Sequence, residues 1–347
     1  MSRRRRWAFV GASLFLSILV PLAALLAADV FLHTRFQRTG GVNIWGYRGP
    51  VVHGKKPGER RVAVLGGSSA YGYGVNGADA LPARLESKLN GGDRPTSVVN
   101  LGYNNEGAYS FRFTLADYLY LDYDVAILYE GYNDLMGDAG LNLSVFRHES
   151  PVFRTTGYLP ILPLVFREKA ASILYRGDIG QMYDELRTGK KVVFKASVAD
   201  RAKAGALNAT ANVGDAIERQ LGRMSPQRPP SVSSPDESGC PRPWAEYCQS
   251  VLTAVEFGLQ HGKRLLVVTQ PYLADKAGVR QVEQQQAMAS AVQRRFGADR
   301  RVAYFNAGTV VDLADPALSF DRMHLTAPGN DRLASALVGP VQGLLTK

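Results

Sequence analysis

Three polar residues near the two ends of the sequence have the types and spacing of a nucleophile and its base. Ser68 lies in the run Gly66-Gly67-Ser68-Ser69, where glycines allow a sharp turn that exposes a serine hydroxyl. Asp321 and His324 are three residues apart, so a turn can place the carboxylate beside the imidazole. A serine becomes nucleophilic when a histidine held by an acid takes its proton. These residues predict acyl transfer through Ser68, with Ser69 as the alternative nucleophile.

Two further groups could contact a reacting ligand. Gly102 follows the apolar run Ser97–Leu101, and a glycine N–H can approach a ligand without obstruction by a side chain. Asn133 lies in the run Gly131-Tyr132-Asn133-Asp134, and its amide can donate a hydrogen bond. Both groups follow apolar runs, as Ser68 does.

These apolar runs have the length of buried strands and alternate with segments of helical spacing. Such alternation is typical of a three-layer α/β/α fold with a central, mostly parallel sheet. Ligands bind at the carboxyl ends of parallel strands, where Ser68, Gly102 and Asn133 all fall. The predicted strands are Val62–Leu65, Ser97–Leu101, Asp124–Tyr129, Arg264–Thr269 and Val302–Phe305, and the predicted helices include Leu81–Leu89, Ser110–Tyr120, Trp244–His261, Gln281–Phe296 and Ala327–Leu345.

Taken together, four blocks resemble the SGNH (GDSL-like) hydrolases, in the family's order. They are the serine in a glycine turn, Gly102, Gly131-Tyr132-Asn133-Asp134 and Asp321-Arg322-Met323-His324. The resemblance covers the chain from about Arg61 onward, apart from an insertion, and implies a flavodoxin-like α/β/α fold. It further implies a Ser68–His324–Asp321 triad, with an oxyanion hole formed by the Ser68 and Gly102 N–H groups and the Asn133 side chain. No cofactor and no metal are implied.

The sequence departs from the family pattern in two places. Gly67 stands where the family usually has Asp before the serine, and the segment Gly102–Gly107 is bulkier and more polar than expected. Tyrosines flank the blocks and are predicted to form walls of the site, with core or rim positions as the alternative. These tyrosines are Tyr71, Tyr73, Tyr103 and Tyr132, while His53, His148 and His261 lack such an acid and are expected to be structural.

The first residues predict a membrane anchor. Trp7–Ala28 carries no charged residue, and 22 helical residues span roughly 33 Å, enough for a hydrocarbon core. Arg3–Arg6 precede the segment and Asp29 follows it, which places the N-terminus in the cytoplasm and the rest of the chain in the periplasm or outside. The alternative is a signal peptide cleaved after Leu26-Ala27-Ala28 and a secreted protein.

The domain organisation follows from these segments. Residues 1–32 form the arginine cluster and anchor, residues 33–60 form a connector expected on the surface, and residues 61–347 form the hydrolase domain. An insertion is expected at about 140–243, because the sheet pattern gives way to an irregular, proline-containing stretch, a helix near Ala199–Met224 and the tract Pro226–Pro235.

Cys240 and Cys248 are the only cysteines, and they flank a proline-containing loop. Outside the cytoplasm thiols oxidise, so a local disulfide is expected, with two unpaired buried thiols as the alternative. The sequence has no His/Cys cluster at metal-ligand spacing, so no structural zinc is expected.

Other classes of protein fit less well. Gly72-Tyr73-Gly74-Val75-Asn76-Gly77 matches a dinucleotide fingerprint in form but lies beyond the strand end. An α/β-hydrolase also runs Ser, Asp, His, but Asp321 lies too close to His324 for that fold. The net charge of +10 is not gathered into a basic stripe, so no nucleic-acid partner is expected. A glycan-binding domain without catalysis remains an alternative.

The resemblance also narrows the substrate. A membrane-tethered SGNH domain outside the cytoplasm is similar to enzymes that act on O-acetyl esters of exported or cell-envelope carbohydrate. The leading expectation is an esterase on such carbohydrates, with an O-acyltransferase on the same polymers and a lipid or lysophospholipid esterase as alternatives.

Overall fold

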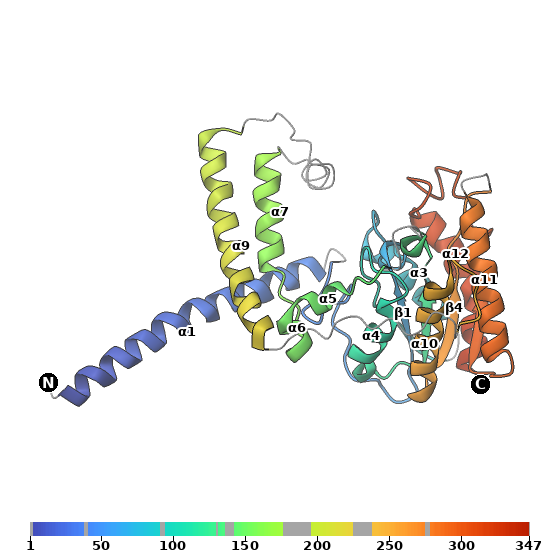
Figure 1. Cartoon of the computed structure of the whole chain (residues 1–347), viewed down its shortest axis with the longest axis horizontal. Coiled ribbons are helices and arrows are strands. Elements are labelled where there is room, and N and C mark those ends of the chain that lie inside the picture. The colour runs from blue at the N-terminus through green and yellow to red at the C-terminus, as the bar shows by residue number, and fades with distance from the viewer. Residues whose placement is uncertain are drawn as a thin grey trace. The chain divides into compact units, whose positions relative to one another are not determined.

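The chain forms two compact units, which are described separately. The computed structural model describes residues 3–37, 41–90, 94–129, 131–135, 142–175, 196–224, 238–274 and 278–346 (Figure 1). The helical unit comprises Met1–Phe36 and Ser150–Gln227, and the sheet unit comprises Gln37–Glu149 and Arg228–Lys347.

The sheet unit is built on five parallel strands. They run in the order β2-β1-β3-β4-β5, so the first strand in the chain lies inside the sheet. Val62 of β1 lies opposite Val98 of β2 and Val125 of β3, which fixes the register of the sheet centre. The strands are β1 (Arg60–Gly66), β2 (Thr96–Asn100), β3 (Val125–Tyr129), β4 (Arg264–Val268) and β5 (Val302–Phe305), as the apolar runs predict.

Helices cover both faces of this sheet because the central strands are apolar on both sides. Val62, Val64 and Ile127 are fully buried in one core cluster with the helices α3 (Leu81–Leu89) and α12 (Ala327–Leu345). The alternate side chains point to the opposite face, where α4 (Ser110–Asp117) and α10 (Ala245–Gln260) lie; Figure 1 shows α4 and α12 on opposite sides of β1. The predicted three-layer α/β/α fold is confirmed.

The remaining helical segments of the sheet unit are short, apart from one. They are α2 (Ser68–Tyr71), η2 (Gly77–Asp79), η3 (Leu119–Leu121), η4 (Tyr132–Asp134), α5 (Phe146–Glu149) and the longer α11 (Val279–Phe296). Two of them, α2 and η4, carry residues of the predicted site directly after β1 and β3.

The helical unit contains α1 (Arg3–Phe36), α6 (Pro151–Thr156), α7 (Leu162–Leu174) and α9 (Val198–Met224). Figure 1 shows α7 and α9 side by side, and Arg167 forms an ion pair with Asp215 between them. Prolines start α6 and α7 because proline is favoured in a first helical turn, where the missing N–H costs nothing. The irregular structure expected here is therefore wrong in these two stretches.

The predicted helix near Ala199–Met224 is confirmed by α9. The tract Pro226–Pro235 lies outside the described residues. The helical unit takes in Ser150–Gln227, which is most of the segment predicted as an insertion, and the boundaries of that insertion stay a prediction.

The C-terminal end of α1 is bound into the helical unit by buried polar contacts. Asp29 Oδ1 accepts hydrogen bonds from the N–H groups of Ile161 (2.9 Å) and Leu162 (2.5 Å), at the start of α7. Asp29 also bonds the Tyr158 hydroxyl, and His33 Nε2 lies 2.8 Å from the Leu159 carbonyl oxygen. A carboxylate at a helix start satisfies N–H groups that have no partner within the helix. Asp29 thereby acts as a cap for α7.

Part of the predicted connector is buried in the sheet unit. Arg48 pairs with Val42 and Asn100 in isolated β-bridges, and Asn43 and Tyr47 are buried beside it. The Arg48 guanidinium donates to the carbonyls of Tyr71, the last residue of α2, and of Gly72 and Val75, which follow it. Those carbonyls need donors because the helix has ended. The expectation of a surface connector is therefore wrong for this stretch.

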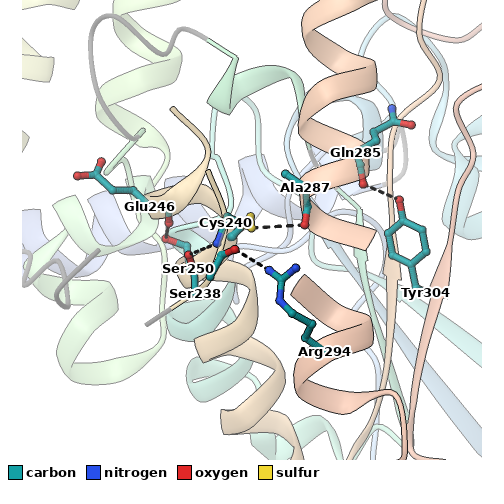
Figure 2. The surroundings of a disulfide bond; sticks show 10 residues. Ser238, Cys240, Glu246, Ser250, Gln285, Ala287, Arg294 and Tyr304 are labelled. Carbon is teal, nitrogen blue, oxygen red and sulfur yellow. Dashed lines mark hydrogen bonds between the residues drawn. A yellow bond between two sulfur atoms is a disulfide. The ribbon is translucent and has the colours of Figure 1, made fainter. Parts of the chain in front are cut away.

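The predicted disulfide is confirmed. Cys240 and Cys248 are bonded, with their Cα atoms 6.4 Å apart, and Cys248 is buried in α10. Figure 2 shows Cys240 beside α11, from which Arg294 donates to the Gly239 carbonyl at 2.7 Å. The disulfide therefore ties the loop before α10 to α10 itself, and the Arg294 hydrogen bond joins the same loop to α11.

Candidate active site

Ser68 stands at the turn between the central strand β1 and the helix α2. The turn needs glycine at position 66, because a Cβ there would lie 2.0 Å from the Tyr129 carbonyl oxygen. Ser68 is the first residue of α2 and is half-buried, whereas Ser69 is buried. The structure therefore brings Ser68, and not Ser69, to the predicted histidine.

The predicted acid and base lie together on a tight turn before α12. His324 Nδ1 is 2.6 Å from Asp321 Oδ2, and His324 Nε2 is 2.8 Å from the Ser68 hydroxyl oxygen. Asp321 Oδ1 also accepts the N–H groups of Met323 (3.0 Å) and His324 (2.6 Å). When Nδ1 donates its hydrogen to Asp321, Nε2 is left as the acceptor for the Ser68 hydroxyl. This is the hydrogen-bonding order that a serine nucleophile requires.

The hydrogen bonds at this turn lower the pKa of Asp321. Burial raises the pKa of Asp321, but hydrogen bonds from the His324 ring and from the N–H groups of the turn oppose that effect and hold the pKa below its ordinary value. A bridge between Ser319 and Leu325 closes the turn, and Ser319 Oγ donates to the His324 carbonyl at 2.9 Å. Asp321 is therefore ionised near neutral pH and can orient His324.

Two exposed aromatic rings contact the histidine. The Tyr73 ring centre is 4.9 Å from that of His324, and the Phe320 ring stacks on His324 at 5.8 Å. Phe320 fits because residue 74 is glycine, since a Cβ there would lie 2.3 Å from the Phe320 ring. Tyr73 and Phe320 are 51% and 46% exposed, so both rings offer surface to a ligand beside Ser68.

Gly102 and Asn133 lie at the ends of β2 and β3, as expected. A Cβ on Gly102 would lie 2.5 Å from Tyr71 N, so this loop packs directly on the backbone of α2. The Gly102 N–H donates to Asn100 Oδ1 at 3.1 Å, a bond that an oxyanion would have to share or replace. Asn133 Nδ2 donates to the Glu106 carbonyl at 2.9 Å, which uses one of its two hydrogens and fixes the amide plane.

Three of the four tyrosines predicted as site walls have partners elsewhere in the protein, whereas the fourth, Tyr73, is the exposed ring beside His324. Tyr71 lies under the Arg48 guanidinium at 4.4 Å, and the Tyr132 hydroxyl donates to the Pro271 carbonyl at 2.7 Å. Tyr103 stacks on Phe146, and burial raises the pKa of Tyr103 to about 12. Their role as substrate contacts stays a prediction.

No motif in the sequence marks Phe320 or Arg48, although the structure places both beside site elements. Phe320 precedes Asp321 directly, so its position next to the block is the one signal that could have marked it. Arg48 contacts the end of α2 from a segment without a motif, and no sequence signal points to it.

The glycines of the apparent dinucleotide fingerprint have local explanations. Gly72 ends α2 with φ of 85°, where its N–H bonds the Ser68 carbonyl, and Gly74 makes room for Phe320. No cluster of three or more His, Cys, Asp or Glu side chains suited to a metal ion occurs in the described part of the chain.

Fold and site together define a three-layer α/β/α protein with a Ser–His–Asp arrangement at the carboxyl edge of its parallel sheet. No family model matches the sequence, and no curated protein sequence matches it significantly. Several solved structures of the GDSL group do resemble the chain.

One is a member of the lipolytic G-D-S-L family from Veillonella parvula DSM 2008, with 7% identity, 81% of this chain and 97% of that chain covered, and a TM-score of 0.41. A lipase/acylhydrolase from Enterococcus faecalis has 13% identity, coverage of 82% and 96%, and a TM-score of 0.41. A mutant acetyl-xylooligosaccharide esterase from Geobacillus has 12% identity, coverage of 83% and 95%, and a TM-score of 0.42. Because the sequence identities are 7–13% and the TM-scores 0.41–0.42, these structures do not assign a reaction to this chain. Its chemistry is inferred from its own residues.

Proposed function

We propose that this protein is a serine ester hydrolase of the SGNH type, with Ser68 as nucleophile, His324 as general base and Asp321 as the residue that orients the base. The observation that carries the proposal is the unbroken series of contacts from Asp321 to His324 (2.6 Å) and from His324 to Ser68 (2.8 Å). The three residues come from the two ends of the chain and meet at the carboxyl edge of the sheet, where open parallel sheets bind ligands.

The reaction has two steps. Ser68 Oγ attacks the ester carbonyl while His324 Nε2 takes the hydroxyl proton, and the carbonyl oxygen becomes an oxyanion. The N–H groups of Ser68 and Gly102 and the amide of Asn133 donate to that oxyanion. His324 then gives its proton to the leaving alcohol, and an acyl-Ser68 remains. His324 then takes a proton from water as the water attacks the acyl carbon, and it returns that proton to Ser68 Oγ as the ester bond breaks, which releases the carboxylic acid and restores the serine.

A fluorophosphonate probe tests this assignment. The probe forms a covalent adduct only with an activated serine, and digestion followed by mass spectrometry locates it. We expect the adduct on Ser68 and no adduct in the Ser68→Ala variant. An adduct on Ser69 would contradict the assignment of the nucleophile. Absence of any adduct on a correctly folded protein would contradict catalysis and favour a domain that binds glycan only.

For the substrate we propose O-acetyl esters of cell-envelope or exported carbohydrate. The exposed rings of Tyr73 and Phe320 beside His324 support this choice, because aromatic faces provide apolar contact surfaces next to the reacting serine. Hydrolysis rates of nitrophenyl acetate and of long-chain nitrophenyl esters test the choice, and a preference for long chains would favour a lipid ester instead.

The same acyl-enzyme could pass its acetyl group to a sugar hydroxyl rather than to water. This O-acyltransferase activity is the second candidate function, since its first step uses the same residues. Incubation with an acetyl donor and an acceptor oligosaccharide separates the two functions. Formation of acetylated oligosaccharide at a higher rate than formation of free acetate would identify the transferase.

We also propose that α1 anchors the protein in the cytoplasmic membrane, with the sheet unit outside the cytoplasm. Trp7–Phe36 is long and apolar enough to cross a membrane. The uncharged segment Trp7–Ala28 supports the anchor, whereas the buried contacts of Asp29 and His33 with residues 158–162 lie after the possible cleavage site and would remain in either form. Intact mass of the mature protein tests this. A mass lacking residues 1–28 would contradict the anchor and favour a signal peptide.

A further inference from the structure

A buried ion pair lies next to the proposed oxyanion donors, and no step of the proposed mechanism uses it. Glu106 and Arg147 are each 1% exposed, and Arg147 Nη1 lies 3.6 Å from Glu106 Oε2. Glu106 belongs to the polar segment that follows β2, and Arg147 belongs to the short helix α5. Burying two charges is expensive, and an apolar pair of similar volume often stabilises a fold as well. The pair therefore calls for an explanation beyond packing.

Arg147 holds the peptide unit that contains the Gly102 N–H. Its Nη2 donates to the Leu101 carbonyl at 2.7 Å, and its Nε donates to the Gly46 carbonyl at 2.8 Å. The Leu101 carbonyl and the Gly102 N–H belong to one planar trans peptide and point in opposite directions. Holding the oxygen therefore sets the direction of the N–H.

The guanidinium itself is fixed in place. It lies over the Tyr103 ring at 4.7 Å and near the Tyr118 ring at 5.4 Å. Cation–π contacts and several hydrogen bonds leave a buried guanidinium little freedom to turn. The Leu101 carbonyl is thus bonded to a rigid donor.

Glu106 connects the same pair to the other proposed donor. Its side-chain Oε1 accepts the N–H of Phe146 at 2.8 Å, which fixes the start of α5 and so the position of Arg147. Its backbone carbonyl accepts a hydrogen bond from Asn133 Nδ2 at 2.9 Å. One residue therefore contacts both the support of Gly102 and the amide of Asn133.

We infer that the Glu106–Arg147 pair positions the oxyanion hole, by holding the peptide that carries the Gly102 N–H and the loop that orients the Asn133 amide. Neither residue touches the substrate, so both are positioning residues. The inference rests on the proposed function, because it concerns donors that act only if Ser68 forms a tetrahedral intermediate.

The test compares four forms of the full chain: wild type, Arg147→Lys, Arg147→Met and the double variant Glu106→Gln/Arg147→Met. The double variant leaves no unpaired buried charge, so we expect it to fold even if Arg147→Met does not. His148→Gln is the matched control, since His148 lies on the same helix but pairs with Asp117 instead. Melting temperature, kcat and KM on nitrophenyl acetate, and the rate of fluorophosphonate labelling at Ser68 are measured for each form.

We expect kcat and the labelling rate to fall by about tenfold to hundredfold in the double variant, with KM changed by less than about threefold, because the lost interaction acts on the transition state. Arg147→Lys should lose less, since an ammonium keeps the charge but cannot reproduce the planar fork of donors. His148→Gln should keep wild-type rates.

Wild-type rates in a folded double variant, or in a folded Arg147→Lys variant, would overturn the inference while leaving the proposed function intact. A loss of melting temperature with unchanged rates in the folded fraction would assign the pair to stability alone and would also overturn it. If the wild-type protein is not labelled at Ser68, the proposed function itself fails, and the inference fails with it.

Discussion

The turn that carries Asp321 and His324 differs from the two loops that carry Gly102 and Asn133 in where its support comes from. The turn is held by hydrogen bonds among residues 319–325, and it meets the distant segment 68–74 through Ser68, Tyr73 and Gly74. The loops are held by buried groups from elsewhere in the chain, including Arg147 on Leu101 and Gln270, whose side chain accepts the Tyr132 N–H at 2.9 Å. The acid–base half of the proposed site is local, whereas the donor half depends on long-range packing.

The largest expected effect concerns the local half. We expect His324→Ala to reduce kcat by about 10⁴-fold, because Ser68 loses its base. Melting temperature should stay near that of wild type, since the turn keeps its other hydrogen bonds. Ester hydrolysis and thermal unfolding measure the two quantities, with His261→Ala as control because His261 is exposed and distant from the triad in the sequence. A large fall in melting temperature would show that His324 stabilises the fold, and the contrast between the acid–base half and the donor half would then not hold.

The next largest effect concerns Asn133, which belongs to the donor half of the proposed site. Asn133→Ala should lower kcat by about 10²–10³-fold with little change in KM, as expected for loss of one oxyanion donor. Asn142→Ala is the matched control, because Asn142 also donates to a carbonyl of the same polar segment, that of Asn105 at 2.8 Å. Equal effects of the two variants on kcat would remove Asn133 from the site.

A third variant probes the packing of that half. Gly102→Ala should destabilise the sheet unit by about 1–3 kcal/mol, because the added methyl meets backbone atoms of α2 that cannot move freely. Gly343→Ala, which meets nothing within 4 Å on α12, should instead stabilise it by about 0.5–1 kcal/mol. Denaturant unfolding measures both. If Gly102→Ala were as stable as wild type, the loop would be less constrained than the structure indicates.

The smallest expected effect returns to the turn. Because the pKa of Asp321 is lowered in the folded protein, its ionised form contributes stability above the ordinary carboxyl pKa of 3.8, and this contribution is lost as the pH falls through the lowered folded value. The stability difference between wild type and Asp321→Asn should therefore be constant near neutral pH and shrink below about pH 4. Urea unfolding over this range measures it, and a difference that does not vary with pH would contradict the charged role.

The sequence predicts the local half and the sheet well for a shared physical reason. Each strand is a short apolar run, and Asp321 and His324 are neighbours on one turn, so the relevant interactions lie within a few residues. The fold, the disulfide and the meeting of Ser68 with His324 follow from such local patterns together with the order of the blocks.

The long-range contacts could not be predicted in this way. Arg147 donates a hydrogen bond to the Leu101 carbonyl, and Arg48 donates to carbonyls at the end of α2. From sequence alone, an isolated arginine in a polar segment is predicted to lie on the surface. Each of these arginines is buried, and it donates to backbone carbonyls of a distant segment. Which carbonyls need such a donor depends on how distant segments of the chain pack, and the local sequence does not determine that. The same buried pair explains the presence of Glu106 in the segment Gly102–Gly107, which is more polar than expected.

The close approach of Phe320 to Gly74 implies that these two positions cannot vary independently. Any side chain at 74 enters the volume of the ring, so Gly74→Ala should behave as a damaging allele that Phe320→Leu partly suppresses. Gly74 also has φ of +80°, a conformation that favours glycine, so a larger residue at position 74 should be rare among related sequences and should occur together with a smaller one at position 320. Such paired substitution at positions 74 and 320 would indicate that the contact of the Phe320 ring with Gly74 is maintained in evolution.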